Sequence, residues 1–469
     1  MNPNIFKAYD IRGRSPEELD AADARRIGQA IASRFAPKRA VVGRDMRTTS
    51  PMLEDALVDG LRSQGVSVVR IGLCSTPMFN YAIAEADGGY DLGVMVTASH
   101  NPAQDNGFKI TLGDNLPVGI GSGMESIRDI TLGDHPMPEA AERGSVEEDP
   151  DVLDRYIEAM WELSGLQGEF SAEGGPAYGW EGWRISVDAG NGMNGYVLPK
   201  LARKLRHADV RELFWQLDGS FPNHEANPLK LETLKDLIAD VKKSGARFGV
   251  AFDGDGDRVG FVDENGEAIP GDMLTALFAR ELLKEKPGGL VLYDLRSSWS
   301  VREAIEEAGG KARMCKVGHA NIKRQMREEG AVFAGELSMH FYFEELKGCE
   351  SGDLAMLLLI RMLQREQKPL SELWKPLQRY AHSGEINFKV KDPKAKINQI
   401  EAHYVGAQHA VPLPIVSHID GIRMEFDDWW FNLRASNTEP LLRLNLEAKD
   451  EAMMHQKVEE LTNAISSEA

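Results

Sequence analysis

The sequence predicts an α/β protein of about three or four domains that ends in a smaller α+β module. Its 469 residues give that number at a typical ~150 residues per domain. Short apolar segments alternate with amphipathic helical segments through most of the chain, which is typical of parallel sheets covered by helices. The last part of the chain instead alternates apolar and polar residues, which is typical of an antiparallel sheet.

Four short apolar segments predict buried strands, and each ends in a polar turn that carries glycine or aspartate. They are residues 40–42, 184–187, 248–252 and 289–293. Amphipathic helical segments such as 231–243 and 272–285 lie between them. Ligands of open parallel sheets bind beyond the carboxyl ends of the strands, so we expect the functional site near these turns.

The C-terminal part is expected to be a separate α+β domain. Residues 385–390, 421–426 and 441–446 alternate apolar and polar side chains, and residues 451–465 predict a closing helix. A polar stretch over 133–150 is one expected domain boundary, and softer ones lie near Asp263 and Lys375. The expected domains are therefore residues 1–150, 151–263, 264–374 and 375–469.

Charge and composition exclude several classes of protein. The formal net charge is -19, whereas nucleic-acid binders and basic membrane-surface proteins need positive fields. An anionic substrate would have to meet arginines and lysines that are gathered locally. Cys74, Cys315 and Cys349 show no CxxC spacing, which argues against a disulfide framework or a zinc site and favours a reducing compartment.

We expect a cytoplasmic protein by elimination. The first residues lack a basic stretch followed by an apolar core, so no signal peptide is expected. The most apolar segment, residues 354–363, is too short to span a bilayer and contains Arg361.

The most informative motif is a run of three aspartates, Asp253, Asp255 and Asp257, separated by glycines and followed by Arg258. Residues two apart in an extended chain face the same side, so the carboxylates are expected to converge. Only a hard, multiply charged cation makes that convergence favourable. A calcium loop would need glycine where Arg258 stands, and a solvated acidic turn would leave the carboxylates uncompensated. We therefore predict a magnesium site with coordination positions open for a phosphate oxygen.

Ser99 is predicted to lie in a turn after a strand at residues 91–96. It is either a nucleophile or a simple turn hydroxyl, and spacing leaves both open. Adjacent side chains of an extended chain point apart, so Ser99 and His100 are not expected to form a catalytic couple. The Asp-Asn-Gly sequence at 105–107 predicts a tight turn that brings Lys109 beside the serine loop, to neutralise phosphate charge or to move a proton.

Two further segments bear on ligand binding. Residues 434–438 offer a guanidinium, two hydroxyls, an amide and backbone N–H groups that suit a phosphate, with a capping turn as the plain alternative. The glycines Gly190, Gly192 and Gly195 match a dinucleotide fingerprint, which supports a nicotinamide enzyme as a second hypothesis. A metal, a nucleophile and an anion clamp together favour phosphoryl transfer.

The motifs together resemble the α-D-phosphohexomutase family, in particular its bacterial phosphomannomutase/phosphoglucomutase branch. They occur in the family's order and cover essentially the whole chain: residues 9–13, 97–102, 253–258, 316–319, 335–340 and 434–440. The resemblance implies three consecutive α/β domains and a C-terminal α+β domain around a central active-site cleft. It also implies an enzyme.

The resemblance implies roles for individual residues. Ser99 would carry a phosphoryl group and hold magnesium together with the three aspartates. Roles in charge balance, proton transfer or positioning are implied for Lys109, Arg12, Arg258, His100, His319 and His340, and whether His319 or His340 is the base stays open. Substrate binding is implied for Tyr9, Arg296, Glu336, Ser338, Arg434, Ser436, Asn437 and Thr438. Met339 stands where glycine is common in the family, so the resemblance does not fix the shape of the sugar pocket there.

The implied reaction moves a phosphoryl group between C1 and C6 of a hexose phosphate, of mannose, glucose or both. A hexose 1,6-bisphosphate would be the intermediate, and glucose or mannose 1,6-bisphosphate the activator. Three alternatives stay open: a phosphoglucosamine mutase-type relative, a sugar-phosphate phosphatase and a non-catalytic sugar-phosphate sensor. Expected partners are hexose phosphates, with no nucleic acid and no membrane, and the oligomeric state is not predicted.

Overall fold

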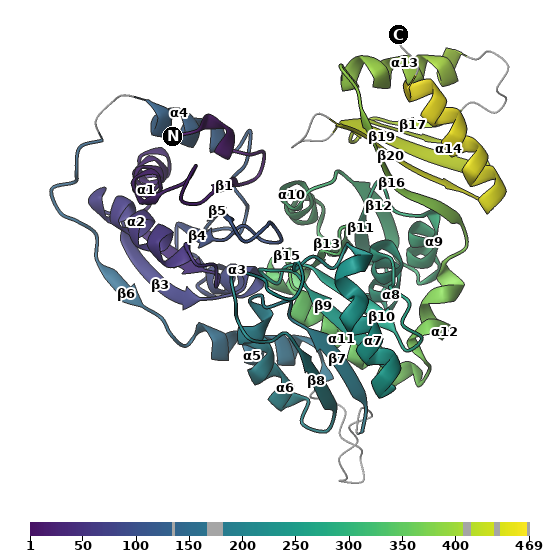
Figure 1. Ribbon diagram of the computed structural model, residues 1–469, viewed down its shortest axis with the longest axis horizontal. Coiled ribbons are helices and arrows are strands. Elements are labelled where there is room, and N and C mark those ends of the chain that lie inside the picture. Colours follow the sequence, from purple (N-terminus) through teal and green to yellow (C-terminus); the bar gives the residue numbers. More distant parts are fainter. Residues whose placement is uncertain (134–136, 167–181, 407–413, 436–440, 467–469) are drawn as a thin grey trace. The chain divides into compact units, whose positions relative to one another are not determined.

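The computed structural model describes residues 1–133, 137–166, 182–406, 414–435 and 441–466. Two compact units make up the chain, and their elements are labelled in Figure 1. The first unit comprises Met1–Ile269 and Ser338–Glu372, and the second comprises Pro270–Leu337 and Leu373–Ala469.

The first unit begins with a sheet in the order β1-β5-β4-β2-β3-β6. Strands β2, β3, β4 and β6 run parallel to one another, while β5 is antiparallel to both β4 and β1. The strands are β1 (Ile11–Arg14), β2 (Arg39–Arg44), β3 (Ser67–Leu73), β4 (Leu92–Val96), β5 (Asp105–Leu112) and β6 (Val146–Glu148).

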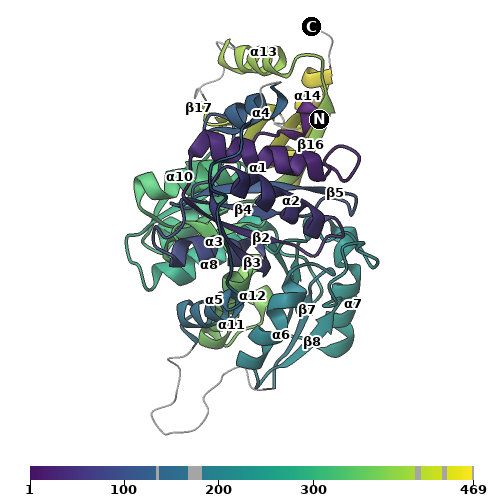
Figure 2. The same ribbon diagram turned by 90° about the vertical axis from the view of Figure 1, so that its left-hand side faces the viewer.

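Helices α1 and α2 pack against each other and on the sheet, as Figure 2 shows, and their apolar residues join β2, β4 and β5 in one core. Asp20 caps α1 through a capping box, because its side chain accepts from Asp23 N. The helices here are α1 (Ala21–Phe35), α2 (Ser50–Ser63), α3 (Thr76–Glu85), α4 (Met124–Leu132) and α5 (Val152–Leu163).

A second sheet of the same unit has the order β10-β9-β7-β8, with β9 and β8 parallel to β7 and β10 antiparallel to β9. Its strands are β7 (Arg184–Asp188), β8 (Asp209–Leu213), β9 (Phe248–Phe252) and β10 (Val259–Asp263). Helices α6 (Asn194–Lys204), α7 (Lys235–Ser244) and α11 (Gly352–Glu366) belong to this unit, together with the hairpin β14 (Phe341–Phe343) and β15 (Cys349–Glu350).

The second unit contains a parallel β12-β11-β13 arrangement and an antiparallel sheet in the order β16-β20-β19-β18-β17. The parallel arrangement consists of β11 (Leu290–Asp294), β12 (Lys311–Cys315) and β13 (Ala331–Gly335), with helices α8 (Gly271–Leu283), α9 (Trp299–Glu307) and α10 (His319–Glu329). The antiparallel sheet consists of β16 (Ala381–Lys389), β17 (Ile415–Ser417), β18 (Ile422–Glu425), β19 (Trp429–Ala435) and β20 (Leu441–Ala448).

Helices α13 (Pro393–Gly406) and α14 (Glu451–Ser466) pack on this antiparallel sheet in Figure 1. Their apolar side chains and those of β18, β19 and β20 form one core. The predicted fold class, parallel α/β domains followed by an α+β module, is confirmed. The short helix α12 (Leu370–Trp374) precedes the module.

The predicted recurrence of strands that end in polar turns has a structural basis. β2, β7 and β11 each lie between two parallel neighbours and end beside an aspartate, Asp45, Asp188 or Asp294. Each of these carboxylates accepts a hydrogen bond from the backbone N–H two residues later, at 3.0, 2.7 and 2.7 Å respectively. The aspartate therefore ends the strand by closing a turn.

One predicted element is wrong. The Asp-Asn-Gly sequence at 105–107 is not a turn but the start of β5, and the reversal lies just before it. Asn106 is buried and its amide donates to Thr49 and Ser50, so tertiary contacts override the local turn propensity. Lys109 nevertheless pairs with Met95 of β4, beside the serine loop as expected.

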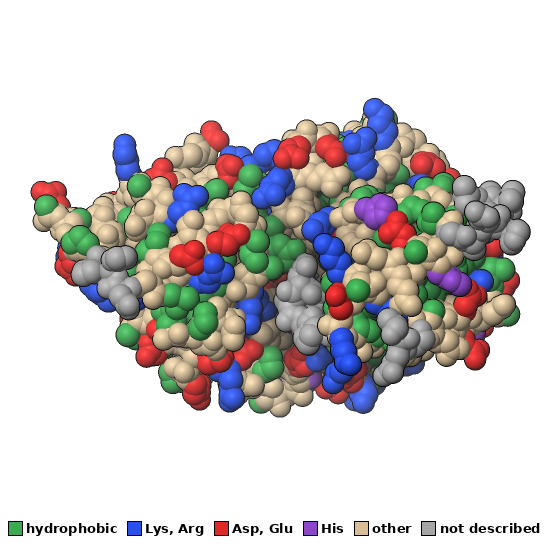
Figure 3. Space-filling view, turned by 90° about the horizontal axis from the view of Figure 1, so that it is seen from above, with side chains coloured by type: hydrophobic (Ala, Val, Ile, Leu, Met, Phe, Trp, Pro, Cys, Tyr) green, Lys and Arg blue, Asp and Glu red, His purple; other side chains and the backbone are tan. Residues whose placement is uncertain are grey.

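The face drawn in Figure 3 carries lysine, arginine, aspartate and glutamate side chains interspersed with apolar ones. Among the described residues, no helix combines the length and the apolar character needed to cross a membrane.

Candidate active site

Ser99 lies in the loop that follows β4, in a left-handed backbone conformation with φ of 51°. Its Oγ is 3.0 Å from Asp253 Oδ2 and 3.2 Å from His100 Nδ1. The expectation that Ser99 and His100 point apart is therefore wrong, because it assumed extended backbone. A left-handed residue turns the chain and brings the two adjacent side chains together.

The three aspartates converge, as predicted, but not because the chain is extended. They lie in the turn that joins β9 to β10. One carboxylate oxygen from each of Asp253, Asp255 and Asp257 lies within 4.8 Å of the others, and all three residues are buried. Asp253 Oδ1 accepts from Gly256 N at 2.9 Å and from Arg258 N at 3.2 Å, which fixes the turn and leaves Oδ2 facing Ser99.

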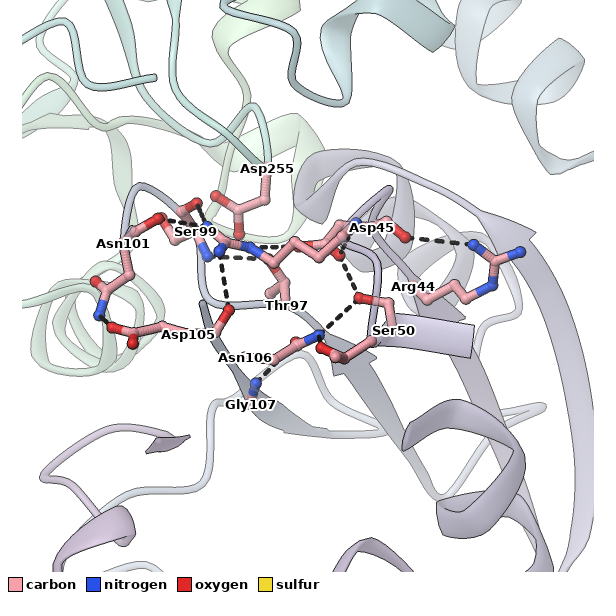
Figure 4. Close-up of polar contacts among 12 residues, drawn as sticks. Arg44, Asp45, Ser50, Thr97, Ser99, Asn101, Asp105, Asn106, Gly107 and Asp255 are labelled. Carbon is pink, nitrogen blue, oxygen red and sulfur yellow. Dashed lines mark hydrogen bonds and ion pairs between the residues drawn. The ribbon is translucent and has the colours of Figure 1, made fainter. Parts of the chain in front are cut away.

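The serine loop and the aspartate loop touch through their backbones. A Cβ at Gly254 would collide with the Ser99 carbonyl oxygen, so only glycine permits this approach. Figure 4 shows Ser99 close to Asp255, although the two loops are far apart in sequence. The nucleophile candidate and the metal-site candidate therefore occupy one place.

Lys109 of β5 joins the two loops electrostatically. Its Nζ is 2.6 Å from Asp255 Oδ2 and 2.6 Å from Asp257 Oδ2. Burial alone would lower the pKa of Lys109, but Asp255 and Asp257 outweigh burial and raise the pKa above its usual value. The ammonium group therefore stays charged at neutral pH, which favours charge neutralisation over proton transfer.

The aspartates are electrostatically unequal. Burial, followed by the charges of Asp257 and Asp255, raises the pKa of Asp253 well above its usual value. Burial acts in the same direction on Asp257, but Lys109 and His340 outweigh it and hold the pKa of Asp257 well below its usual range. Such a crowded set of carboxylates is stabilised by positive charge.

The carboxylates fit a hard cation. Asp255 Oδ2 is occupied by Lys109 and by Thr76 Oγ1, whereas the buried Asp255 Oδ1 has no hydrogen-bond partner among the described residues. An unpaired buried carboxylate oxygen is costly unless a cation binds it. Oxygen ligands in this number suit Mg²⁺, which leaves further positions for water or a phosphate oxygen.

Several predicted cationic and imidazole groups surround the cluster. Arg12 of β1 donates to Asn101 Oδ1 at 2.6 Å and to Asp10 Oδ2 at 2.5 Å, so it reaches the serine loop. His100 lies between the cations: Arg258, burial and Arg12 lower its pKa well below the usual value, so the imidazole is neutral.

His340 joins the aspartate loop to the segment that begins at Ser338. Its Nε2 is 3.2 Å from Arg258 Nε and 3.3 Å from Asp257 Oδ1, and its Nδ1 is 3.1 Å from Ser338 Oγ. Tyr9 precedes β1, the strand that carries Arg12.

The second unit positions another group of predicted residues. Arg296 pairs with Asp294, the strand-end aspartate of β11, at 2.7 Å. Glu336 Oε1 accepts from Gly318 N at 2.9 Å, which ties the end of β13 to the residue before His319, where α10 begins. These contacts place Glu336 and His319 on neighbouring segments.

Arg434 of β19 is buried and points towards Glu385 of β16, with Nη2 3.2 Å from Glu385 Oε2. Arg443 and Arg296 also contact Glu385, at 3.2 and 3.8 Å. Burial, followed by the Arg296 charge, lowers the pKa of Arg434. A cluster of cations around one carboxylate is suited to an additional anion. Ser436, Asn437 and Thr438 lie outside the described residues.

The glycine fingerprint has a packing role. A Cβ at Gly192 would collide with the Gly254 carbonyl oxygen, and one at Gly195 with the Trp215 carbonyl oxygen. Met193 N donates to that Gly254 oxygen at 2.9 Å. Gly192 thus lets the turn after β7 support the aspartate loop, and Gly195 lets it approach the segment after β8, which accounts for both glycines without a dinucleotide.

Two site residues were missed in the sequence. Thr76 at the start of α3 donates to Asp255 Oδ2 at 2.6 Å, and its N–H donates to the Asp255 carbonyl oxygen at 2.8 Å. The Ser75-Thr76-Pro77 sequence signals a helix start but not a contact with a distant loop. Arg47, which follows the turn after β2, donates to the backbone of the serine loop, and no local signal announces this.

Comparisons with known proteins identify the family. Phosphoglucomutase/phosphomannomutase models match residues 3–133 (alpha/beta/alpha domain I), 154–266 (domain II), 270–380 (domain III) and 385–464 (C-terminal domain). The chain belongs to the phosphoglucomutase/phosphomannomutase family. It is an enzyme of the phosphohexomutase kind.

Individual relatives agree with this assignment over their full length. A protein named phosphohexose mutases from Xanthomonas campestris pv. campestris is 40% identical, over 99% of this chain and 100% of the relative. A phosphomannomutase of Methanocaldococcus jannaschii is 40% identical, over 98% and 97% of the two chains. The crystal structure of a phosphoglucomutase/phosphomannomutase family protein from Burkholderia thailandensis matches with a TM-score of 0.85 and 34% identity, over 99% and 97% of the chains.

Met339, where the resemblance led us to expect glycine, adopts a left-handed conformation with φ of 66°. Glycine takes this conformation without strain, whereas a residue with a Cβ does not. Here the methionine is buried and its Sδ lies 3.1 Å from where a Cβ on Gly260 would stand. Contact with β10 therefore offsets the backbone strain.

We predict that Met339→Gly melts at a higher temperature than Met339→Ala. Both lose the same packing, but alanine keeps a left-handed strain of about 1 kcal/mol that glycine relieves. Met356, buried in α11 of the same unit, is the matched control, since glycine costs about 1 kcal/mol more than alanine inside a helix. Calorimetric melting should thus rank glycine and alanine in opposite orders at the two positions, and the same order at both would contradict the assigned backbone.

Proposed function

We propose that this enzyme moves a phosphoryl group reversibly between C1 and C6 of a hexose phosphate, of mannose, glucose or both. Ser99 carries the group as a phosphoserine, and a hexose 1,6-bisphosphate is the intermediate. Full-length relatives that are named phosphomannomutase and phosphohexose mutases support this substrate class. The expected partners are hexose phosphates alone.

One observation carries the proposal: Ser99 Oγ stands 3.0 Å from a carboxylate of the buried aspartate cluster. A serine hydroxyl that merely closes a turn has no need of three acidic side chains. A phosphoryl group on this oxygen, by contrast, would bring its own oxygens to the position where the aspartates can share a cation with them.

Asp253, Asp255, Asp257 and the phosphorylated Ser99 would hold one Mg²⁺. When bound, the ion neutralises charge on the transferring phosphoryl group and polarises it. The chain supplies the remaining positive charge through Lys109, Arg12 and Arg258, which lie around the same two loops. Phosphoryl transfer depends mainly on such positioning and charge stabilisation.

The chemical step balances without any further reactant. A sugar hydroxyl oxygen bonds to phosphorus as the bond from phosphorus to Ser99 Oγ breaks, and the hydroxyl proton passes to a base of the enzyme. The bisphosphate then turns around and returns its other phosphoryl group to Ser99. His340, which contacts Arg258 and Ser338, and His319, beside the Glu336 segment, are the candidates for base or positioning group.

The groups that hold the sugar are proposed from the family pattern. Glu336 and Ser338 would grip two adjacent hydroxyls, and Tyr9 and Arg296 would line the substrate site. Arg434 with Ser436, Asn437 and Thr438 would clamp the phosphate that is not reacting. Because glucose and mannose differ at C2, a loop that reads the shared C3 and C4 hydroxyls would accept both sugars.

The four expected segments, 1–150, 151–263, 264–374 and 375–469, would then each contribute one loop. The first supplies Ser99, the second the aspartates, the third Glu336 and the fourth Arg434. Glucose or mannose 1,6-bisphosphate would act as the activator by phosphorylating Ser99.

Replacing the carrier should abolish turnover. Ser99→Ala is expected to lower kcat by several orders of magnitude, because removal of a nucleophile in covalent catalysis leaves only binding and charge stabilisation. Ser122→Ala, in a turn of the same domain, is the matched control and should keep wild-type kinetics. Steady-state assays with glucose 1-phosphate and a trace of bisphosphate measure both, and a Ser99→Ala enzyme with wild-type rates would refute the carrier.

Removing divalent ions should abolish activity, and added Mg²⁺ should restore it. A second readout avoids dependence on turnover: Mg²⁺ should raise the melting temperature of the wild type by mass action, but not that of Asp255→Asn. The matched acidic control is Asp263→Asn, which alters the turn after β10 and should retain the Mg²⁺-dependent shift. An enzyme that is indifferent to chelation would contradict the metal site.

Product analysis separates the reaction from its alternatives. Supplied with mannose 1-phosphate and glucose 1-phosphate in separate assays, the enzyme should form the 6-phosphates, and the ratio of kcat/KM gives the sugar preference. Steady release of inorganic phosphate without isomerised product would instead indicate a phosphatase, and binding without any turnover would indicate a sensor.

A further inference from the structure

Arg47 is buried to 1% exposure beneath the serine loop. Its guanidinium donates hydrogen bonds to four backbone carbonyl oxygens in and beside that loop. Nη2 donates to the carbonyl oxygens of Ser99 and Asn101 at 2.7 Å each, and Nη1 donates to those of Pro102 and Asp105 at 2.7 and 2.9 Å. Both terminal nitrogens are thus committed to the protein backbone, so Arg47 has no donor directed at a ligand.

Arginine is suited to this task. Four carbonyl oxygens that point at one place repel one another, and a planar cation with donors in a fixed fork offsets that repulsion. A lysine ammonium in the same place has three donors around a point charge, and it could not reach all four oxygens in this geometry.

Arg47 is itself held firmly. Asp45, the strand-end aspartate of β2, pairs with its Nε at 3.2 Å, and Ser50 Oγ donates to Asp45 at 2.5 Å. The guanidinium also lies over the Phe221 ring, 5.1 Å from the centroid. Figure 4 shows Asp45 and Ser50 in the same hydrogen-bonded network as Ser99 and Asn106.

The Asp-x-Arg pattern occurs twice at equivalent places. Asp294 and Arg296 follow β11 as Asp45 and Arg47 follow β2, and in both pairs the arginine contacts the aspartate two residues before it. In the second unit Arg296 approaches Glu385 and the Arg434 cluster. In the first unit the equivalent arginine, Arg47, instead donates to backbone carbonyl oxygens.

The contact between Arg47 and the Ser99 carbonyl oxygen determines the direction of the Ser99 side chain. The Ser99 carbonyl oxygen accepts a hydrogen bond from Arg47 and is in close contact with Gly254. The Ser99 N–H donates to Thr97 Oγ1 at 3.0 Å. With both of its peptide groups fixed, Ser99 is kept in the left-handed conformation that serine otherwise disfavours. That conformation aims Oγ at Asp253.

We propose that Arg47 is a positioning residue for phosphoryl transfer: it holds Ser99 in its left-handed conformation and so keeps the carrier oxygen on the aspartate cluster. The inference rests on the proposed function of Ser99. It predicts that loss of the guanidinium slows transfer without weakening the binding of hexose phosphate, because Arg47 does not touch the ligand.

The test uses Arg47→Lys and Arg47→Ala in the full-length enzyme. A displacement of the carrier oxygen by about 1 Å can cost about 100-fold in rate, so we expect a loss of that order in kcat for both variants, with KM for glucose 1-phosphate within about twofold of the wild type. Millimolar guanidinium chloride should restore part of the kcat of Arg47→Ala and none of that of Arg47→Lys, whose ammonium fills the space. Arg361→Lys, at an equally buried arginine of α11, is the matched control for lost stability and should keep its kcat.

The outcomes are distinguishable. Wild-type kcat in Arg47→Lys, or a KM that rises in step with the fall in kcat, overturns the inference. If Ser99→Ala is inactive while Arg47→Lys is fully active, only this inference fails, whereas an active Ser99→Ala removes the proposed carrier and the inference with it. If neither Arg47 variant folds, a crystal structure of the wild-type enzyme decides, and Ser99 with negative φ or without the Arg47 contact overturns the inference.

Discussion

The site depends on one buried contact, between a serine hydroxyl and a carboxylate 154 residues later in the chain. Around it lie three acidic side chains that burial makes costly and that repel one another. Without any bound ion, Lys109 offsets part of the negative charge of these carboxylates, and a dication would offset the rest. The fold therefore retains an arrangement that is unfavourable without its ligand, which is typical of functional sites rather than of stabilising ones.

The way in which the chain assembles this contact is repetitive. Each α/β segment contains a set of three strands in which the first is central, the second lies on one side and the third on the other: β2, β3 and β4, then β7, β8 and β9, then β11, β12 and β13. The serine loop, the aspartate loop and the Glu336 segment each follow the third strand of their set. Three segments with chemically different side chains thus share one topological position, the carboxyl end of a strand, where open sheets bind ligands.

Much of this could be predicted from the sequence, because the signals are local. Apolar runs that end in Asp45, Asp188, Asp253 and Asp294 identify the central strands and the aspartate loop, and the structure contains both. What failed was backbone conformation at single residues. Ser99 adopts a left-handed φ value that serine does not favour, and residues 105–107 form a strand where their composition favours a turn. Contacts from distant segments decide these places, and such contacts leave no local signal.

Arg47 shows why some site residues cannot be predicted from the sequence. It has the same spacing from its aspartate as Arg296, so the two look equivalent in the chain, and only the family pattern singles out Arg296. Both guanidiniums contact the aspartate of the motif, and the difference lies in what else they meet: backbone carbonyl oxygens for Arg47, and Glu385 with neighbouring arginines for Arg296. A buried cation whose terminal nitrogens donate to backbone acts on the conformation of a loop, whereas one that lies beside other cations retains capacity for an anion. One motif is thus placed once against the backbone of the serine loop and once beside the Glu385 and Arg434 cluster.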